Sequence, residues 1–371
     1  MSYTSDVIDD VVSSKFKTAV EDGEQPGYSI YDQDDVDRFL HPVKEKMEPD
    51  LGSPDNPLMA VKVTVMSPGT VIGVCIQHGV VDGQGELLFV KAWSRVFRGL
   101  GLDGEYAPDN TRSFGVGLKT DEEPLTDRYT LVTSRENNKE TEKLMEILST
   151  SAGRQFCIIP FTKAKLAEMK SRSSVDLPGG SFVSTNDVIT ATVIKAVIKT
   201  KCSQFEIPVD SQEQVVVWRG LNLRSFSIPQ LTSTNTSNAT ANMWLYLTVD
   251  QVMTMSVRDI ALALRARMKE WTKEKLMAEI QWRQNAETSG LKVQFKVNRL
   301  SFNVSSLIFP NVGVEDYDFG CKCGIFEFSL LNPICVYMTP RPGQDGVNVW
   351  WSGQRQALET FAKTITSLSD I

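Results

Sequence analysis

The chain has 371 residues, 41% of them hydrophobic and 23% charged, which is typical of a globular enzyme and long enough to favour two domains. The net charge of −7 argues against nucleic acid as a partner, because binding phosphate needs a basic surface. No apolar run reaches the ~18 residues that cross a membrane, and the N-terminus lacks the basic and apolar regions of a signal peptide.

The first strongly patterned segment is a β-hairpin. Residues 1–57 are polar and acidic, and they favour at most a short helix over 36–47. Residues 59–65 alternate with period two and place Val61, Val63 and Val65 on one face, and residues 71–77 form the second strand after a turn. A helix over 86–98 follows, with apolar residues at helical spacing. Residues 103–137 are charged and irregular, as expected of a crossover between domains.

The second half predicts a mixed set of helices and strands. Ser184-Thr185-Asn186-Asp187 caps a helix that runs to residue 199, because a hydroxyl suits the N-cap and a carboxylate suits the first turn. The expected strands are 156–161, 214–219, 243–249, 299–307, 334–338 and 347–351. The other expected helices are 162–171, 256–284 and 354–368. Because helices and strands do not alternate strictly, we predict an α/β fold of α+β type with mixed sheets.

His78 is the best candidate for chemistry. It is one of two histidines in the chain, and it ends the second hairpin strand in Gln77-His78-Gly79-Val80-Val81-Asp82-Gly83. An imidazole at a strand end suits general-base catalysis, because its ordinary pKa lies close to neutral pH. The spacing alone leaves a core histidine as an alternative.

Several motifs, taken in order, resemble the BAHD family of acyl-CoA-dependent acyltransferases. His78, Asp82 and Gly83 match the family's His-x-x-x-Asp-Gly motif, and Asp318-Phe319-Gly320 matches the start of its later Asp-Phe-Gly-Trp-Gly motif. The segment 184–187 and the run Asn222-Leu223-Arg224 resemble further family segments. The resemblance extends from about residue 57 to the C-terminus.

The resemblance implies two chloramphenicol-acetyltransferase-like domains with a tunnel between them. We expect an N-terminal domain over 1–125, a crossover linker over 126–155 and a C-terminal domain over 156–371. His78 lies nearer the N-terminus than the family pattern places it, so the first domain is expected to be incomplete. Cys321 and Lys322 replace an aromatic residue and a glycine of the later motif, so no role of that aromatic residue is carried over.

The family pattern also implies roles for individual residues. His78 is the general base, and Asp82 points away from it to pair with an arginine, although a catalytic dyad is the alternative. Asp318, Phe319 and Gly320 belong to the scaffold, with Asp318 paired to Arg224 and Gly320 in a tight turn. The weaker candidates are Ser184, Thr185 and Asn186 for binding coenzyme A, and Ser305 and Ser306 for donating to the oxyanion.

Three other kinds of site are less consistent with the sequence. Asp-Phe-Gly is also a kinase motif, but no glycine-rich phosphate loop precedes it. Cys321 and Cys323 lack a second Cys or His pair nearby, so we expect no metal. Gly83-x-Gly85 is too short for a dinucleotide-binding motif and is better interpreted as a tight turn.

We therefore predict an acyltransferase that moves an acyl group from acyl-CoA to a hydroxyl or amine of a small-molecule acceptor, through a ternary complex. It is expected to be a cytoplasmic monomer with free thiols and no permanently bound cofactor. Two alternatives remain. One is a condensation-type domain that uses a carrier-bound thioester, although such domains commonly carry His where this chain has Gln77. The other is a truncated, non-catalytic relative that binds small molecules.

Overall fold

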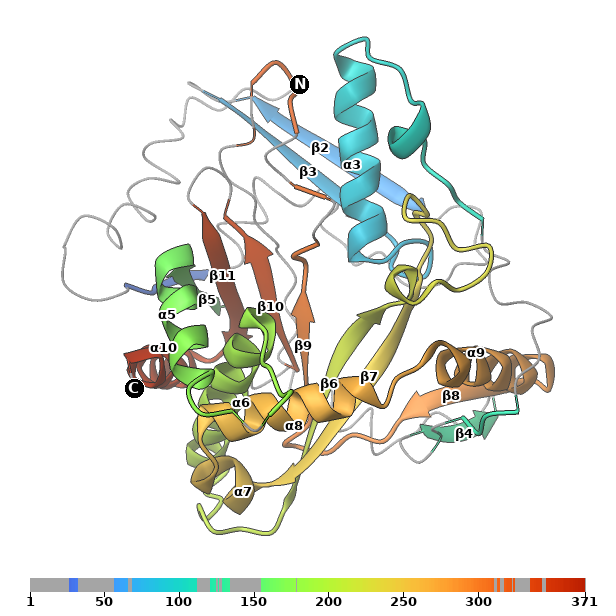
Figure 1. The fold of residues 1–371 in the computed structure, drawn as a ribbon. Helices are drawn as coiled ribbons and strands as arrows, with labels where there is room; N and C mark the ends of the chain where they lie inside the picture. The colour runs from blue at the N-terminus through green and yellow to red at the C-terminus, as the bar shows by residue number, and fades with distance from the viewer. Residues whose placement is uncertain are drawn as a thin grey trace.

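The computed structural model describes residues 27–32, 57–65, 69–111, 121–124, 126, 129–133, 155–177, 179–309, 312–313, 317–321, 323, 334–341 and 345–370. The possible helix over 36–47 lies outside these residues, as does Lys322. No helix among the described residues is long and apolar enough to cross a membrane. Helices and strands are mixed, as the sequence predicts (Figure 1).

A seven-stranded mixed sheet forms the lower part of the molecule in Figure 1. Its order is β1-β5-β11-β10-β9-β6-β7, and β9 runs parallel to both neighbours whereas the other pairs are antiparallel. The strands are β1 Ser29–Asp32, β5 Gln155–Thr162, β6 Gln214–Asn222, β7 Thr240–Thr248, β9 Phe302–Ser306, β10 Cys335–Pro340 and β11 Gly346–Gly353.

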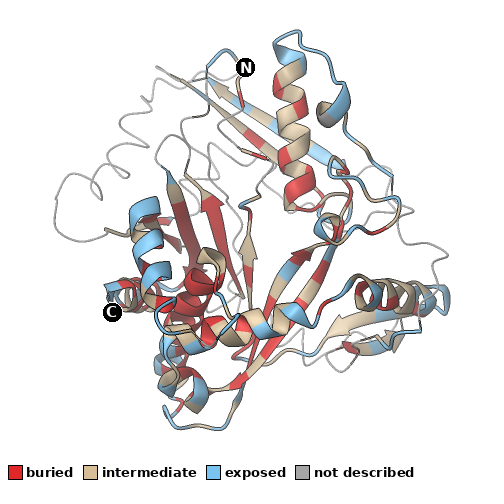
Figure 2. Ribbon diagram, in the orientation of Figure 1, coloured by how far each residue is buried: buried red, intermediate tan, exposed pale blue. Residues whose placement is uncertain are grey.

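Helices cover one face of this sheet and form the main core, whose buried residues appear red in Figure 2. The central helix α6, Thr185–Gln204, is buried over most of its length between α8 and α10. The helices of this half are α5 Lys163–Ser173, α6, α7 Val249–Thr254, α8 Val257–Lys269, α9 Lys273–Thr288 and α10 Arg355–Asp370, with the 3₁₀ turn η4 Leu223–Phe226 after β6.

The hairpin and the helix after it form a separate unit in the upper part of Figure 1. Strands β2 Met59–Val65 and β3 Thr70–Ile76 pair with each other and with no other described strand. Helix α3 Gly83–Phe97 follows, and the 3₁₀ turn η3 Gly104–Tyr106 packs against it. A third small sheet pairs β4 Tyr129–Thr133 with β8 Leu291–Phe295.

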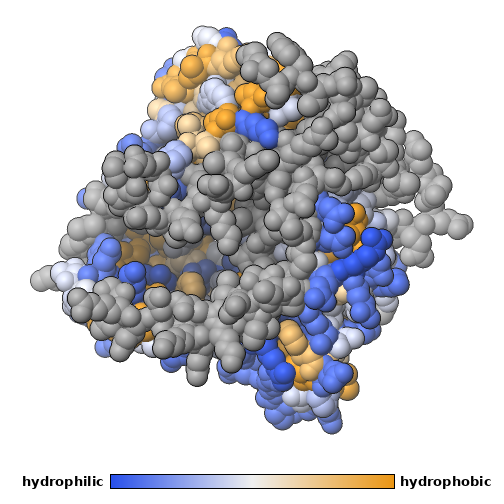
Figure 3. Space-filling model, turned by 180° about the vertical axis from the view of Figure 1, so that it is seen from behind, coloured by the Kyte–Doolittle hydropathy of each residue, from blue (hydrophilic) through white to orange (hydrophobic). Residues whose placement is uncertain are grey.

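The predicted apolar face of the hairpin is exposed. Met59, Val61, Val63 and Val65 are 41%, 38%, 56% and 55% exposed. Figure 3 shows hydrophobic side chains gathered over this part of the molecule, seen from behind. The alternation identifies the strand correctly, but it cannot identify what covers its apolar face.

Two sequence predictions about elements are wrong. The helix expected over 256–284 is two helices, because Thr272 accepts from the Lys275 N–H and so caps a new helix start. The irregular connection 103–137 contains η3 and β4.

Strand β1 comes from the predicted first domain and pairs with β5 of the second. The seven-stranded sheet therefore takes strands from both predicted domains. The domain limits themselves stay a prediction.

Candidate functional site

The turn after β3 presents the His78 ring to solvent. Gln77 is buried, and its backbone N–H donates to the carbonyl oxygen of Leu58 at 2.9 Å. The Val80 N–H donates to the Gln77 carbonyl oxygen at 2.8 Å and closes a tight turn around His78. His78 itself is exposed. The ring is thus accessible to a small molecule, as a general base must be.

Asn238, which the sequence analysis did not select, is the contact of His78 in the described structure. Its Nδ2 donates to the His78 carbonyl oxygen at 2.7 Å and lies 3.2 Å from Nδ1 of the ring. Thr240 Oγ1 donates to the Asn238 Oδ1 at 2.7 Å, which orients the amide. The two contacts of the amide, with the backbone and with the ring, fix how the imidazole is oriented against the loop before β7.

Asp82 does not contact His78, because both of its oxygens are already used. Arg224 donates to Oδ2 at 2.7 Å and to Oδ1 at 3.1 Å. The Gly85 N–H donates to Oδ1 at 2.8 Å, and the Ala239 N–H donates to Oδ2 at 2.9 Å. The side chains of Asp82 and Arg224 are only 2% and 3% exposed. The geometry is that of a buried structural ion pair and excludes a dyad in this arrangement.

The predicted pairing of Asp318 with Arg224 is wrong. Asp318 lies 3.5 Å from Arg98, at the end of α3, and both side chains are about a third exposed. Arg224 cannot also reach Asp318, because the buried Asp82 occupies it. The correct arginine could not be chosen from the sequence, since Arg224 and Asp82 are 142 residues apart.

The later motif packs on the outer face of α3. The Phe319 ring lies 4.9 Å from Trp93 and 5.6 Å from Phe97, centroid to centroid. Gly320 has φ +93°, and its N–H donates to the Asp318 Oδ1 at 3.0 Å. This is the tight turn that the sequence predicts, at a φ that glycine adopts without strain.

Gly83 and Gly85 serve close packing, and not the sharp turn predicted from the sequence. Both lie in the first turn of α3. A Cβ on Gly85 would lie 2.1 Å from the Thr236 carbonyl oxygen, and one on Gly83 would lie 2.4 Å from Leu307 Cδ2. The start of α3 therefore rests directly on the loop before β7 and on the residue that follows β9.

The two serines at the end of β9 differ in surroundings. The Ser306 Oγ is buried and finds no hydrogen-bond partner among the described residues, which is not true of the Ser305 Oγ. Ser306 directly precedes Leu307, which packs on Gly83 of the histidine motif. A buried hydroxyl without a partner is costly, so this group is available for a ligand oxygen.

Ser184 is the N-cap of α6, and Thr185 and Asn186 are its first two residues. The Ser184 hydroxyl accepts from the Asp187 N–H at 3.1 Å and donates to its carboxylate at 2.7 Å, so it is already committed. The first-turn N–H groups of Thr185 and Asn186 have no acceptor within the helix.

Positive charge collects beside this helix start. Asp187 is shared by two arginines: Arg265, whose Nε lies 2.9 Å from it, and Arg219, at 3.4 Å. Arg219 contacts no other acceptor among the described residues, and burial lowers its pKa. Two guanidinium groups and one carboxylate leave an excess of positive charge at the N-terminus of a helix, which is an environment that favours an anion.

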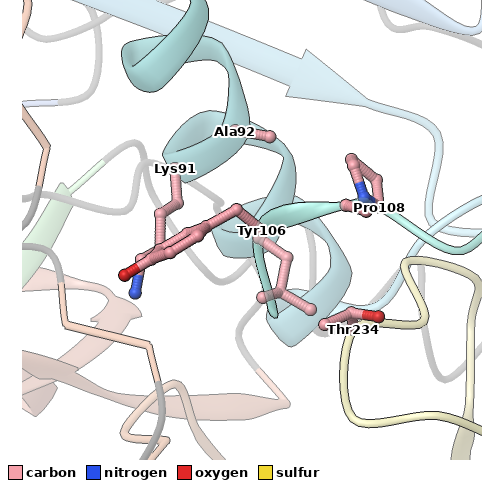
Figure 4. Close-up of a pocket in the computed structure, with 7 residues that line it drawn as sticks. Lys91, Ala92, Tyr106, Pro108 and Thr234 are labelled. Atoms are coloured by element: carbon pink, nitrogen blue, oxygen red, sulfur yellow. The ribbon is translucent and has the colours of Figure 1, made fainter. Parts of the chain in front are cut away.

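A small pocket lies between α3 and the loop before β7 (Figure 4). Its lining residues are Leu88, Lys91, Ala92, Tyr106, Ala107, Pro108 and Thr234. Figure 4 places Tyr106 and Thr234 on the segments that approach each other across the pocket.

The six cysteines of the sequence form no disulfide bond with one another. No group of three His, Cys, Asp or Glu side chains that could hold a metal occurs among the residues the structure describes.

Comparisons with known proteins agree with the fold. The model of the Transferase family matches residues 15–368. No curated protein matches the sequence. The structure of F. sporotrichioides TRI101 complexed with coenzyme A and T-2 is 18% identical, with a TM-score of 0.67 over 88% of this chain and 72% of that one.

Two other solved structures are similar. F. graminearum TRI101 complexed with ethyl coenzyme A is 16% identical, with a TM-score of 0.64 over 87% of this chain and 71% of that one. Vinorine synthase is 16% identical, with a TM-score of 0.61 over 91% and 72%. At such identities the likeness shows the fold.

Proposed function

The chain belongs to the Transferase family, an acyltransferase family of the BAHD type, and on that premise we propose that it transfers an acyl group from acyl-CoA to a small-molecule hydroxyl or amine. One observation carries the proposal. The only imidazole among the described residues is exposed at a strand end, where Asn238 from the second half of the chain contacts both its ring and its backbone carbonyl oxygen.

His78 is the general base of the proposed reaction. The acceptor oxygen or nitrogen attacks the thioester carbonyl carbon while His78 takes its proton. A new C–O or C–N bond forms, the C–S bond breaks, and the departing thiolate takes the proton from the imidazolium. Both substrates are bound at once, and no acyl-enzyme forms. Asp82 contributes only by holding the turn, since its oxygens are saturated.

Ser306 is our candidate donor to the developing oxyanion. Its hydroxyl is buried and has no partner within the part of the chain that the structure describes, and Ser306 adjoins the residue that packs on the histidine motif. A donor that is already desolvated and in place stabilises a developing charge more than one that must first leave water. Ser305 does not share this property.

The start of α6 is our candidate site for an anionic part of coenzyme A. The N–H groups of Thr185 and Asn186 and the positive charge of Arg219 and Arg265 support this assignment. The acceptor would reach His78 from another side, through a passage between the predicted domains 1–125 and 156–371.

The test is incubation with a panel of acyl-CoA thioesters and alcohol or amine acceptors, with products identified by mass spectrometry. His78→Ala is expected to lower kcat by about 10²–10⁴-fold, the contribution of a general base. Coenzyme A affinity, measured by calorimetry, should be unchanged. Coenzyme A binding without turnover of any acceptor would instead favour a non-catalytic relative, and full activity of the His78→Ala variant would exclude the mechanism.

A further inference from the structure

A short segment after η3, residues 107–111, joins the helix that follows the histidine motif to the loop that carries Asn238. We call this segment the strap. Tyr106, immediately before it, is held against α3 by Arg95, whose guanidinium lies 3.6 Å from the ring centroid. From there the strap reaches the loop 232–237, across the pocket of Figure 4.

Backbone hydrogen bonds fasten the strap to the loop at Asp109. Its N–H donates to the Thr234 carbonyl oxygen at 3.1 Å, and its own carbonyl oxygen accepts from the Thr236 N–H at 2.6 Å. Asn235 Nδ2 donates to the Thr111 carbonyl oxygen at 2.8 Å. The strap and the loop, more than a hundred residues apart in sequence, are therefore joined by a short series of backbone hydrogen bonds.

The Asp109 carboxylate adds side-chain contacts to the same loop. It accepts from the Thr232 hydroxyl at 2.8 Å, from Asn235 Nδ2 at 3.4 Å and from the Thr111 N–H at 2.9 Å. Hydrogen bonds from Thr111, and then from Thr232 and Asn235, lower the pKa of Asp109 to about 2. The group therefore stays ionised over the working range of pH, as a permanent acceptor does.

Hydrogen bonds also hold the backbone of this loop on either side of Asn238. Arg224 donates to the carbonyl oxygens of Asn235 and Ser237, each at 2.8 Å. The Ala239 N–H donates to Asp82. Asn238 is thus flanked on both sides by backbone that is fastened, and its amide is the group that contacts the His78 ring.

We propose that Asp109 is a positioning residue, which holds the loop 232–238 so that the Asn238 amide keeps the His78 ring correctly oriented. This inference rests on the proposed role of His78. The Asp82–Arg224 pair fastens the loop from its buried side, and Asp109 fastens it from the exposed side. Small displacements of a catalytic group are costly, since about 1 Å can change a rate about 10²-fold.

The test compares Asp109→Ala with Asp103→Ala, a matched control whose exposed carboxylate makes no capping hydrogen bond to η3. Asp109→Ala is expected to lower kcat about tenfold and to leave KM for acyl-CoA within about twofold. In nuclear magnetic resonance spectra, Asp109→Ala should also shift the ring resonances of His78, whereas Asp103→Ala should leave them in place.

A double-mutant cycle separates positioning from general loss of structure. Asp109→Ala should add no further loss of kcat in an Asn238→Ala background, because its effect passes through that amide. Additive losses, or unchanged His78 ring resonances in folded Asp109→Ala protein, would overturn the proposal. The spectra need no turnover, so a wild-type protein that transfers no acyl group would refute the proposed function separately.

Discussion

Replacing Asp82 with alanine should destabilise the whole protein, and the size of the loss follows from its surroundings. The substitution leaves Arg224 as a charge whose side chain is 3% exposed and without its carboxylate partner. Breaking a buried ion pair from one side costs ~3–5 kcal/mol. Two backbone N–H groups, of Gly85 and Ala239, lose their acceptor as well. We therefore expect the upper half of that range, a large part of the 5–15 kcal/mol typical of folded proteins.

The assay is equilibrium unfolding in urea, followed by far-ultraviolet circular dichroism. Asp82→Ala should lower the midpoint by more than about 1 M, given typical denaturant slopes. The exposed Asp103→Ala variant serves as the charge-matched control. Removing both charges, in Asp82→Ala/Arg224→Met, should recover part of the loss, because no unpaired charge then remains buried although the backbone groups that these side chains bind still lack partners.

The same variants distinguish a structural aspartate from a catalytic one. If Asp82→Ala lost less than about 1 kcal/mol of stability and yet abolished turnover, Asp82 would have to act on His78 directly. The structural interpretation of its contacts would then be refuted. A double variant as unstable as the single one would refute the argument from the unpaired guanidinium.

Three further predictions concern packing, charge and the oxyanion. Gly85→Ala should lower the free energy of unfolding by at least ~1–3 kcal/mol, because the new Cβ clashes with the loop backbone. Gly101→Ala is the control, since no atom lies closer than 3.9 Å to its Cβ. Equal melting temperatures of the two variants would contradict this prediction. Burial lowers the pKa of Lys201 to about 7. Above that pH the unfolded chain therefore binds more protons than the folded one. The free energy of unfolding should rise by about 2 kcal/mol between pH 7 and 9, relative to the Lys201→Met variant. Parallel pH profiles of the two proteins would contradict this. Ser306→Ala should lower kcat by about 10²-fold while Ser305→Ala does not, and equal effects of the two in steady-state kinetics would remove Ser306 from its role.

Local chemistry explains which elements could be predicted. The start of α6 follows from Ser184 and Asp187, whose reciprocal capping hydrogen bonds the structure shows. The alternating runs predict β2 and β3, and the strand that ends at His78 follows from them. The split between α8 and α9 was missed because the capping residue Thr272 lies inside a continuous charged run.

The contacts of the site were far less predictable, because they join distant parts of the chain. The Asn238 amide reaches a ring 160 residues away, and Arg224 reaches a carboxylate 142 residues away. The strap at Asp109 meets its loop across a similar separation. The only local sign at Asn238 is an Asn-Ala-Thr triplet, which also occurs by chance.

The sequence by itself determined the kinds of groups available and the local turns that present them: an imidazole at a strand end, a carboxylate one turn further on, and a capped helix start. Propensity, capping and periodicity act over a few residues, so these features can be predicted from neighbours alone. Only the tertiary structure decided that Asp82 binds Arg224, that Asn238 contacts His78 and that the Ser306 hydroxyl is buried. Those pairings depend on which distant surfaces pack together and exclude water, and local sequence does not specify that.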